Sequence, residues 1–431
     1  MKLRFIHLSD IHFSNRAARI GFDPDSAMRQ AVLDDVKVMR GRLGDANAIL
    51  VTGDIAFAGL RSEYDDAAKW LAEICEAAGC RPESVLLCPG NHDIDQSVIK
   101  ANALIQDGQD AIRRGQDFYT KNKALIDRLV QPEARALFYS PMAAFNEFAA
   151  RYQCSFFANS ESFVWERDFE LNDSSILRIR GLNTALLSGL ADVQGSMFLG
   201  DRAWTFPKQV GVEYLVMAHH PPRWLGDEDE ADRAFNASTK IQLFGHEHDL
   251  RVIPGRDWIR MYAGAINPHR AEPNWCPGYN VIEAAVETGS SRVLNVDVHA
   301  RTWQGTPPQF RSVEDVDEKK TFNVKIPLAN LPPTLHRTTS STSTPSQEST
   351  NREPRKEATE MDSDLRFRSA VFRFFKLTLS KKNEVVGHLR LAEEEDSRLT
   401  DVERFKLALA RARERDQMSD LEAILTTMEK D

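Results

Sequence analysis

The chain has 431 residues, of which 42% are hydrophobic and 28% charged, and a formal net charge of −9. This length exceeds what one hydrophobic core usually holds, so it indicates two or three domains. The acidic balance excludes a generally basic polyanion-binding surface, whereas a local basic patch would still permit nucleic-acid binding.

Strand and helix signals alternate over residues 1–90. Apolar runs predict strands at 3–9, 47–52 and 84–88, and residues 62–79 have the apolar spacing of an amphipathic helix. This βαβαβ order predicts an α/β fold, in which ligand-binding residues lie at the carboxyl ends of the strands.

The middle of the chain has a helical pattern first and strand signals after it. Residues 97–155 are almost continuously helical in pattern and predict a helical insertion or cap over the sheet edge. Strand signals then return, and the short connections between the later ones favour an antiparallel or mixed second sheet. These strands are expected at 176–183, 212–218, 241–244, 258–263, 279–286 and 292–300.

The C-terminal part separates into a tether and a bundle. Residues 336–364 are nearly free of apolar side chains, so they predict a flexible linker after a first domain at 1–335. Residues 365–431 regain helical periodicity and predict a small all-α interaction domain without a catalytic cluster. Two of its helices are expected to begin at T/S-x-x-E capping boxes, Thr400 with Glu403 and Ser419 with Glu422.

Five predicted strands end in residues that can bind metal ions. The motifs are D-x-H (Asp10, His12), GD (Asp54), GNHD (Asn91, His92, Asp93), HHPP (His219, His220) and GHEH (His246, His248). Oxygen and imidazole ligands without thiolate favour Mn, Fe, Zn or similar divalent ions. The set exceeds the needs of one ion, which predicts two metals that share a bridging carboxylate.

Each motif alone also has an ordinary structural explanation. Asp10 could cap a helix, Asn91 could end a turn, and single histidines are often solvated surface groups. Five such motifs in order at strand ends argue against that explanation for the set. Asp95, just after GNHD, is left without a role.

The ordered set resembles the calcineurin-like metallophosphoesterase superfamily over roughly residues 3–300. The resemblance implies a four-layer α-β-β-α sandwich of two mixed sheets. It also implies Asp10, His12 and His248 on one metal ion, Asn91, His219 and His246 on the other, and Asp54 as the bridge. HHPP leaves the choice of ligand less secure, because His220 could contact substrate instead.

The same resemblance assigns chemistry to GNHD. His92 would be the general acid toward the leaving oxygen or the stabiliser of its developing charge. Its neighbour Asp93 is expected to orient His92, an inference from adjacency alone.

The function implied is hydrolysis of a phosphodiester or monoester, of nucleotide type, by in-line attack of a metal-bridging hydroxide. Two cations (Mn, Fe, Zn or Ni) would lower the pKa of the bridging water from about 15.7 to about 7. Alternatives are a DNA or RNA nuclease, a phosphoprotein phosphatase, and a catalytically silent scaffold that acts through the C-terminal bundle.

The C-terminal helical pattern is similar to bacterial death-like or effector-associated adaptor domains. This resemblance implies a protein partner for residues 365–431, in signalling or defence. Five scattered cysteines without CxxC pairs indicate a reducing compartment. No signal peptide or apolar run of about 18 residues is found, so we expect a cytoplasmic protein without membrane association.

Overall fold

The computed structural model describes residues 2–14, 23, 25–156, 164–190, 192–267, 275–289, 291–331 and 354–429. It divides into two compact units, residues 1–149 with 154–329 and residues 150–153 with 330–431. Within the described residues, no helix combines the length and the apolar character needed to cross a membrane.

A seven-stranded mixed sheet contains the first three predicted strands. β1 (Leu3–Leu8), β2 (Ala48–Val51) and β3 (Val85–Leu87) pair in parallel, because a helix returns the chain after each strand. The other four strands are antiparallel to their neighbours. The strand order is β12-β11-β10-β1-β2-β3, and β13 pairs with β11 outside this order. They are β10 (Gly278–Thr288), β11 (Arg292–Gly305), β12 (Pro308–Ser312) and β13 (Phe322–Pro327).

A second mixed sheet has six strands in the order β4-β5-β6-β7-β9-β8. Its bounds are β4 (Val164–Glu170), β5 (Ile176–Leu182), β6 (Val212–Met217), β7 (Thr239–Phe244), β8 (Arg251–Pro254) and β9 (Ile259–Tyr262). The sequence analysis had assigned every strand from 176 to 300 to this second sheet, and that prediction was wrong for two of them. β10 and β11 join the first sheet instead, since β10 pairs antiparallel with β1 and is thereby buried over most of its length.

Apolar side chains hold the two sheets together, with helices packed outside them. The rings of Phe5 on β1 and Phe169 on β4 meet edge to face at 5.2 Å, and the indole of Trp165 donates to the Leu87 carbonyl at 2.9 Å. α2 (Ser26–Leu43) and α3 (Arg61–Ala78) pack on each other, α10 (Glu228–Ser238) packs on β7, and the short α9 (Asp201–Trp204) contacts α10. The predicted α/β class with two mixed sheets is confirmed.

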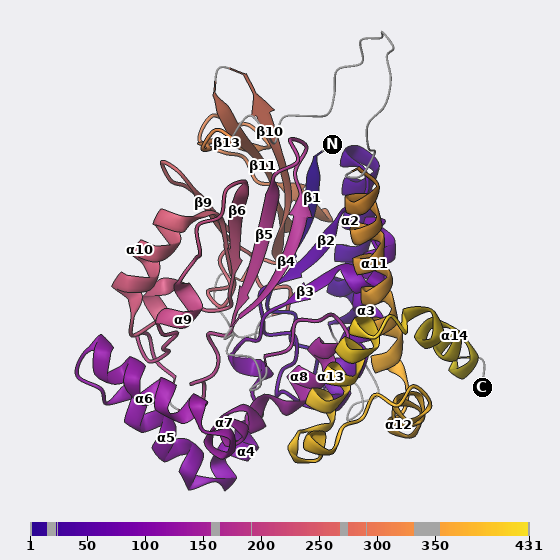
Figure 1. The fold of residues 1–431 in the computed structure, drawn as a ribbon. Helices are drawn as coiled ribbons and strands as arrows, with labels where there is room; N and C mark the ends of the chain where they lie inside the picture. The colour runs from indigo at the N-terminus through magenta and orange to yellow at the C-terminus, as the bar shows by residue number, and fades with distance from the viewer. Residues whose placement is uncertain are drawn as a thin grey trace, which may run out of the picture. The chain divides into compact units, whose positions relative to one another are not determined.

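A run of helices lies between β3 and β4, and Figure 1 shows α4 to α7 gathered together. Asn102 and Asp117 begin two of these helices by accepting backbone N–H groups of Leu104 and Thr120 at 3.0 and 2.8 Å. The expected helical insertion is therefore present. Its helices are α4 (Gln96–Ala101), α5 (Ala103–Arg113), α6 (Phe118–Val130), α7 (Pro132–Tyr139) and α8 (Ala143–Ala150).

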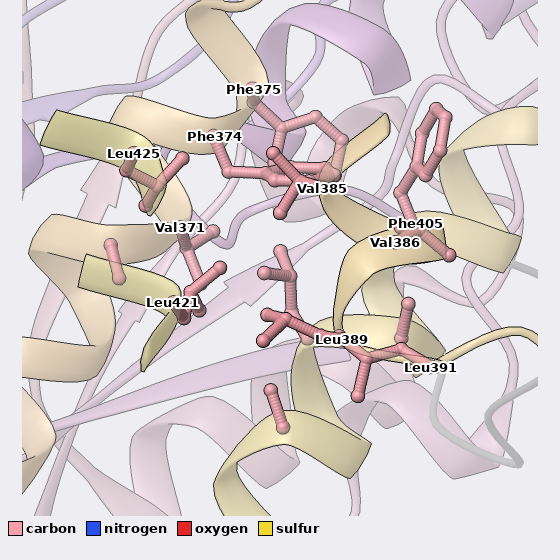
Figure 2. Close-up of a cluster of buried hydrophobic side chains, with 14 of the residues drawn as sticks. Val371, Phe374, Phe375, Val385, Val386, Leu389, Leu391, Phe405, Leu421 and Leu425 are labelled. Atoms are coloured by element: carbon pink, nitrogen blue, oxygen red, sulfur yellow. The ribbon is translucent and has the colours of Figure 1, made fainter. Parts of the chain in front are cut away.

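The C-terminal unit is helical and has its own apolar core, in which Phe374, Val385, Phe405 and Leu421 lie among the buried side chains (Figure 2). Its helices are α11 (Pro354–Lys376), α12 (Leu379–His388), α13 (Asp401–Glu414) and α14 (Met418–Met428). α11 includes residues 354–364, the last part of the range predicted as a tether, and residues 336–353 lie outside the described part.

Only one of the two predicted capping boxes begins a helix. Thr400 and Glu403 form the expected reciprocal bonds at the start of α13. Ser419 instead lies inside α14, which begins at Met418. The backbone N–H of Gln417, the residue before α14, donates to the Ala412 carbonyl at 2.8 Å in the turn after α13. The second capping prediction was wrong.

Candidate metal centre

Polar side chains from the carboxyl ends of five strands lie together. The strands are β1, β2 and β3 of the first sheet and β6 and β7 of the second, so the cluster lies where the same ends of two sheets approach each other. Four sets of three residues place potential ligand atoms within 4.8 Å of one another. They are Asp10–His12–His248, His12–Asp54–His92, Asp10–Asp54–His219 and His219–His220–His246.

The backbone in this cluster is locally strained. Five of the residues that were predicted to bind metal have positive φ: Asp10 (53°), His12 (53°), Asp54 (51°), His246 (69°) and His248 (55°). Left-handed backbone is costly for residues with a Cβ and persists only where the surroundings impose it. These turns redirect side chains that would otherwise alternate across the sheet, and the sequence analysis did not predict them.

Glycines next to these residues leave no room for a side chain. A Cβ on Gly53, whose φ is +94°, would lie 2.6 Å from Nδ1 of His219. On Gly90 it would overlap the Asp54 carboxylate, and on Gly245 it would overlap the Ser9 hydroxyl. The three glycines thus admit the close approaches from which the cluster is built.

The first group of ligand atoms comes from the ends of β1 and β7. Nε2 of His248 lies 3.2 Å from Oδ1 of Asp10, and Nε2 of His12 lies 3.2 Å from Oδ2 of Asp54. The other Asp10 oxygen accepts the backbone N–H of His246 at 3.2 Å. Both carboxylates are buried, so their charge requires nearby compensation.

The second group combines an amide oxygen with two imidazoles. Oδ1 of Asn91 lies 3.1 Å from Nε2 of His219 and 3.0 Å from Nδ1 of His246, and these two nitrogens are 3.2 Å apart. Oδ2 of Asp54 is 3.4 Å from Nε2 of His219. One oxygen of Asp54 therefore faces a histidine of each group.

Carbonyl groups fix the orientation of two rings. Nδ1 of His12 lies 2.9 Å from the Asn267 carbonyl oxygen, and Nδ1 of His219 lies 2.7 Å from that of Thr52. A carbonyl only accepts, so each Nδ1 carries a proton, and a neutral ring then presents the lone pair of Nε2 to Asp54. Lone pairs that face a carboxylate need a cation or a second ring proton between them. The donor set therefore fits a divalent cation.

The pKa values show the same need for positive charge. Burial lowers the pKa of His219, but the Asp54 carboxylate outweighs it and raises that pKa to about 9. Burial likewise opposes ionisation of Asp54, yet His219 and His92 hold its pKa well below the ordinary value. Asp54 is thus ionised at neutral pH and is placed to attract cations.

His92 lies beside the first group. Its Nδ1 is 2.8 Å from the Phe57 carbonyl, its backbone N–H donates to Asp54 at 2.8 Å, and its ring meets the ring of His12 at 4.7 Å. Because Nδ1–H donates to this carbonyl, Nε2 is the ring atom left for proton exchange.

The carboxylate of Asp93 binds backbone N–H groups of two loops and not the ring of His92. Its carboxylate accepts backbone N–H groups of Ile55, Ala56 and Gly90 at 3.3, 3.0 and 2.8 Å and the hydroxyl of Tyr64 at 2.9 Å. Burial and the charge of Asp54 raise the pKa of Asp93 to about 6, so the group is still ionised at neutral pH. The adjacency argument missed this role, because the side chains of successive residues point to different places.

His220 is buried beside the cluster, whereas Asp95 lies at the start of a helix. His220 is 1% exposed, and its Nδ1 and backbone N–H contact the Thr184 hydroxyl at 3.0 and 3.1 Å. Its Nε2 is buried without a hydrogen-bond partner in the described structure. Asp95, which had no predicted role, accepts the Ser97 N–H at 2.9 Å and begins α4.

The strand at 258–263 was predicted, but the polar residue that follows β9 was not recognised as part of the site. Asn267 follows β9, its carbonyl contacts His12, its amide donates to the Asp10 carbonyl at 3.1 Å, and its side chain donates to the Ile11 carbonyl at 3.1 Å. The available signal was a mostly apolar run, Trp258–Ala263, with Gly264 directly after it and Asn267 three residues further on. Trp224, just after HHPP, was also missed, and its ring meets the ring of His246 at 4.0 Å.

Solved structures show distant likeness. GAP50, the anchor in the inner membrane complex of Plasmodium, aligns with a TM-score of 0.37 and 9% identity over 77% of this chain and 90% of that chain. A putative 5'-nucleotidase from Staphylococcus aureus, in complex with alpha-ketoglutarate, aligns with a TM-score of 0.34 and 11% identity over 74% of this chain and 57% of that chain.

Sequence comparisons identify both units. The chain is 27% identical over 266 residues to the uncharacterized metallophosphoesterase-like protein YydB of Bacillus subtilis (strain 168), which covers 58% of this chain and 49% of that protein. The chain thus spans about half the length of this curated relative. A model of the GTPase-associated adaptor domain matches residues 366–427, which confirms the resemblance to adaptor domains. The calcineurin-like phosphoesterase model matches residues 3–250, more than half of the 431 residues, and the chain belongs to this family.

Proposed function

We propose that the chain is a metal-dependent phosphoesterase that hydrolyses phosphodiesters of nucleotide type. One observation carries this proposal: the buried carboxylate of Asp54 faces His12 at 3.2 Å and His219 at 3.4 Å, and so joins two groups of ligand atoms. Two cations that share a carboxylate are the usual arrangement for in-line displacement at phosphorus.

The proposed ligand sets are those expected from the motifs. Bound ions would supply Lewis-acid stabilisation of the phosphoryl oxygens and a water of lowered pKa. Asp54 would contact both ions, and the carbonyls of Asn267 and Thr52 orient His12 and His219 for binding. One ion would be held by Asp10, His12 and His248 and the other by Asn91, His219 and His246.

His92 is proposed as the general acid. The Phe57 carbonyl keeps a proton on Nδ1, so a doubly protonated ring would present its second proton at Nε2. Transfer of this proton to the leaving oxygen would stabilise the product alcohol or phosphate.

Asp93 and His220 are proposed as positioning residues. The bonds of Asp93 tie the loop after β2 to the turn that carries Asn91, so the residue acts on the ligands through the backbone. The ring of His220 contacts the ring of His246 at 4.5 Å and is buried, which favours support of His246 over contact with substrate. This replaces the roles first expected for both residues.

The C-terminal unit is proposed to recruit a protein. The match of residues 366–427 to a GTPase-associated adaptor domain supports a GTPase, or a protein bound to one, as the partner class. Binding of purified candidate GTPases to the full chain, and not to a chain that lacks residues 366–427, is the corresponding measurement.

Turnover tests the catalytic proposal. The metal-reconstituted full chain should hydrolyse bis-p-nitrophenyl phosphate, and Asp54→Asn should abolish turnover while the circular dichroism spectrum stays unchanged. Lys325→Gln is a matched control, since this side chain is 61% exposed on β13. Metal-loaded wild type that cleaves no phosphoester would support the scaffold alternative.

A further inference from the structure

A polar cavity lies beside the proposed metal centre. Its volume is about 350 Å³, and His248 forms part of its wall. The opposite wall comes from the first sheet, with Thr302 on β11, Arg311 and Ser312 on β12, and Glu314 just after them. A cavity of this size is in the range of small-molecule sites and holds a group about as large as a nucleoside phosphate.

A buried ion pair fixes the wall on which Arg311 and Ser312 lie. Arg301 donates to both oxygens of Asp35, at 2.8 and 2.6 Å, and both side chains are buried. The remaining guanidinium nitrogen donates to the Ser312 hydroxyl oxygen at 2.9 Å. The hydroxyl oxygen of Ser312 is thereby occupied as an acceptor, and its hydrogen is left to donate to a ligand.

Arg311 places an exposed guanidinium in this wall, in the same lining as the Glu314 carboxylate. No hydrogen-bond or ion-pair partner is found for its side chain among the described residues, whereas Arg301 and Arg251 are paired with Asp35 and Glu247. A guanidinium beside a hydroxyl donor matches the geometry of a phosphate group.

Glu314 limits the kind of ligand that fits. Its carboxylate also has no side-chain partner among the described residues, and it would repel a ligand that is anionic throughout. It can accept hydrogen bonds from hydroxyl groups. The wall therefore combines recognition of one anionic group with recognition of hydroxyls, which are the two features of a sugar phosphate.

We propose that this cavity binds a second phosphate group of the substrate together with its sugar, so that the substrate is a nucleotide diester with an additional phosphate. Arg311 and Ser312 hold this phosphate, Glu314 contacts sugar hydroxyls, and the scissile phosphate lies toward His248. This inference rests on the proposed phosphodiesterase function and specifies its substrate class.

A pair of chromogenic substrates separates the two claims. Uridine 5'-(p-nitrophenyl phosphate) and its 3'-phosphorylated analogue both keep the 2'-hydroxyl that Glu314 would contact, and they differ by the second phosphate on O3'. For the metal-loaded wild type, the 3'-phosphate should lower KM by roughly tenfold with little change in kcat, because one charge-assisted contact is added. Arg311→Ala should remove this difference, and Arg311→Lys should restore part of it.

A control and a binding measurement complete the test. Arg256→Ala removes a guanidinium that is 95% exposed and lies outside this cavity, so both KM values should stay unchanged. Titration calorimetry with uridine 3',5'-bisphosphate, which keeps the 2'-hydroxyl, should show weaker binding to Arg311→Ala than to wild type, whether or not turnover occurs. An equal KM ratio or equal binding in these two proteins would overturn the subsite. Absence of turnover on every diester, with Arg311-dependent binding retained, would instead overturn the phosphodiesterase function.

Discussion

At the residue scale, the carboxylate of Asp54 is the point where the two ligand groups meet. One of its oxygens accepts the His92 amide at 2.8 Å, and the other faces His12 and His219. The amide and the two imidazole rings favour the ionised form of this buried carboxylate. The geometry of this one side chain therefore explains why metal binding and catalysis are proposed to depend on the same residue.

Neighbours within GNHD should separate metal binding from proton transfer. Asn91→Ala removes the oxygen that His219 and His246 share, so about one divalent ion per chain should be lost. His92→Ala should retain metal and lower kcat by roughly 10²- to 10⁴-fold, the range for loss of a general acid. Elemental analysis and steady-state kinetics measure both effects. Equal metal loss in the two variants would show that His92 is a ligand.

At the element scale, tight turns at strand ends create the site. The parallel strands end at the same edge, and left-handed residues together with Gly53, Gly90 and Gly245 bring their side chains into contact. Apolar runs predicted where these strands end, since a buried strand has a clear sequence pattern. Aspartate and histidine are enriched among non-glycine residues with positive φ, but most of them still have negative φ, so residue type alone did not place the left-handed turns.

Gly53→Ala tests the turn after β2. The new Cβ would overlap His219 in a backbone of φ +94°, so the free energy of unfolding should fall by about 1–3 kcal/mol. Urea denaturation measures this change. Gly41→Ala is the control, because a Cβ there meets no atom within 4 Å in α2 and should raise stability by about 0.5–1 kcal/mol. Equal effects of both substitutions would contradict the account of the turn.

Glu283 on β10 links strand pairing to pH. Burial raises its pKa, but His299 and Arg4 outweigh burial and lower it to about 2, below the ordinary value of 4.5. A group with a lowered folded pKa stabilises the fold above the unfolded pKa, and this contribution is lost as the pH falls from 4.5 toward 2.

Glu283→Gln should therefore lower the free energy of unfolding at pH 7 by about 1 kcal/mol, a value that allows for solvent screening. The deficit should shrink as the pH falls below about 4.5. Glu287→Gln on the same strand should change little, since its pair with Lys325 is exposed. Urea titrations at several pH values measure both variants, and a pH-independent deficit for Glu283→Gln would contradict the explanation.

At the scale of the whole molecule, the sequence analysis correctly predicted two mixed sheets and a helical insertion. It did not correctly predict which strands belong to which sheet. Short connections placed β10 and β11 in the second sheet, yet β10 pairs with β1 and β11 pairs with β10, so both belong to the first. β4, with the sequence VWERDFE, was missed because the buried Arg167 follows Trp165 on the inner face and interrupts the apolar alternation that marks a strand. Pairing partners depend on contacts far apart in the sequence, which periodicity does not encode.

The C-terminal unit has an apolar core of its own, so its stability should be separable from catalysis. Phe405→Ala removes a buried ring from that core and should cost about 3–5 kcal/mol within the unit. Amide hydrogen exchange should rise over residues 366–427 while turnover of bis-p-nitrophenyl phosphate stays within about twofold. Leu379→Ala, at a side chain that is 53% exposed, is the matched control. A parallel loss of turnover would show that the units depend on each other.

The central claim is that Asp54 is shared by two metal positions, and metal stoichiometry tests it most directly. We predict about two divalent ions per wild-type chain, weaker binding of both in Asp54→Asn, and weaker binding of one in Asp10→Asn, with circular dichroism as the control for folding. A single ion in the wild type, or two ions bound with unchanged affinity in Asp54→Asn, would contradict the account.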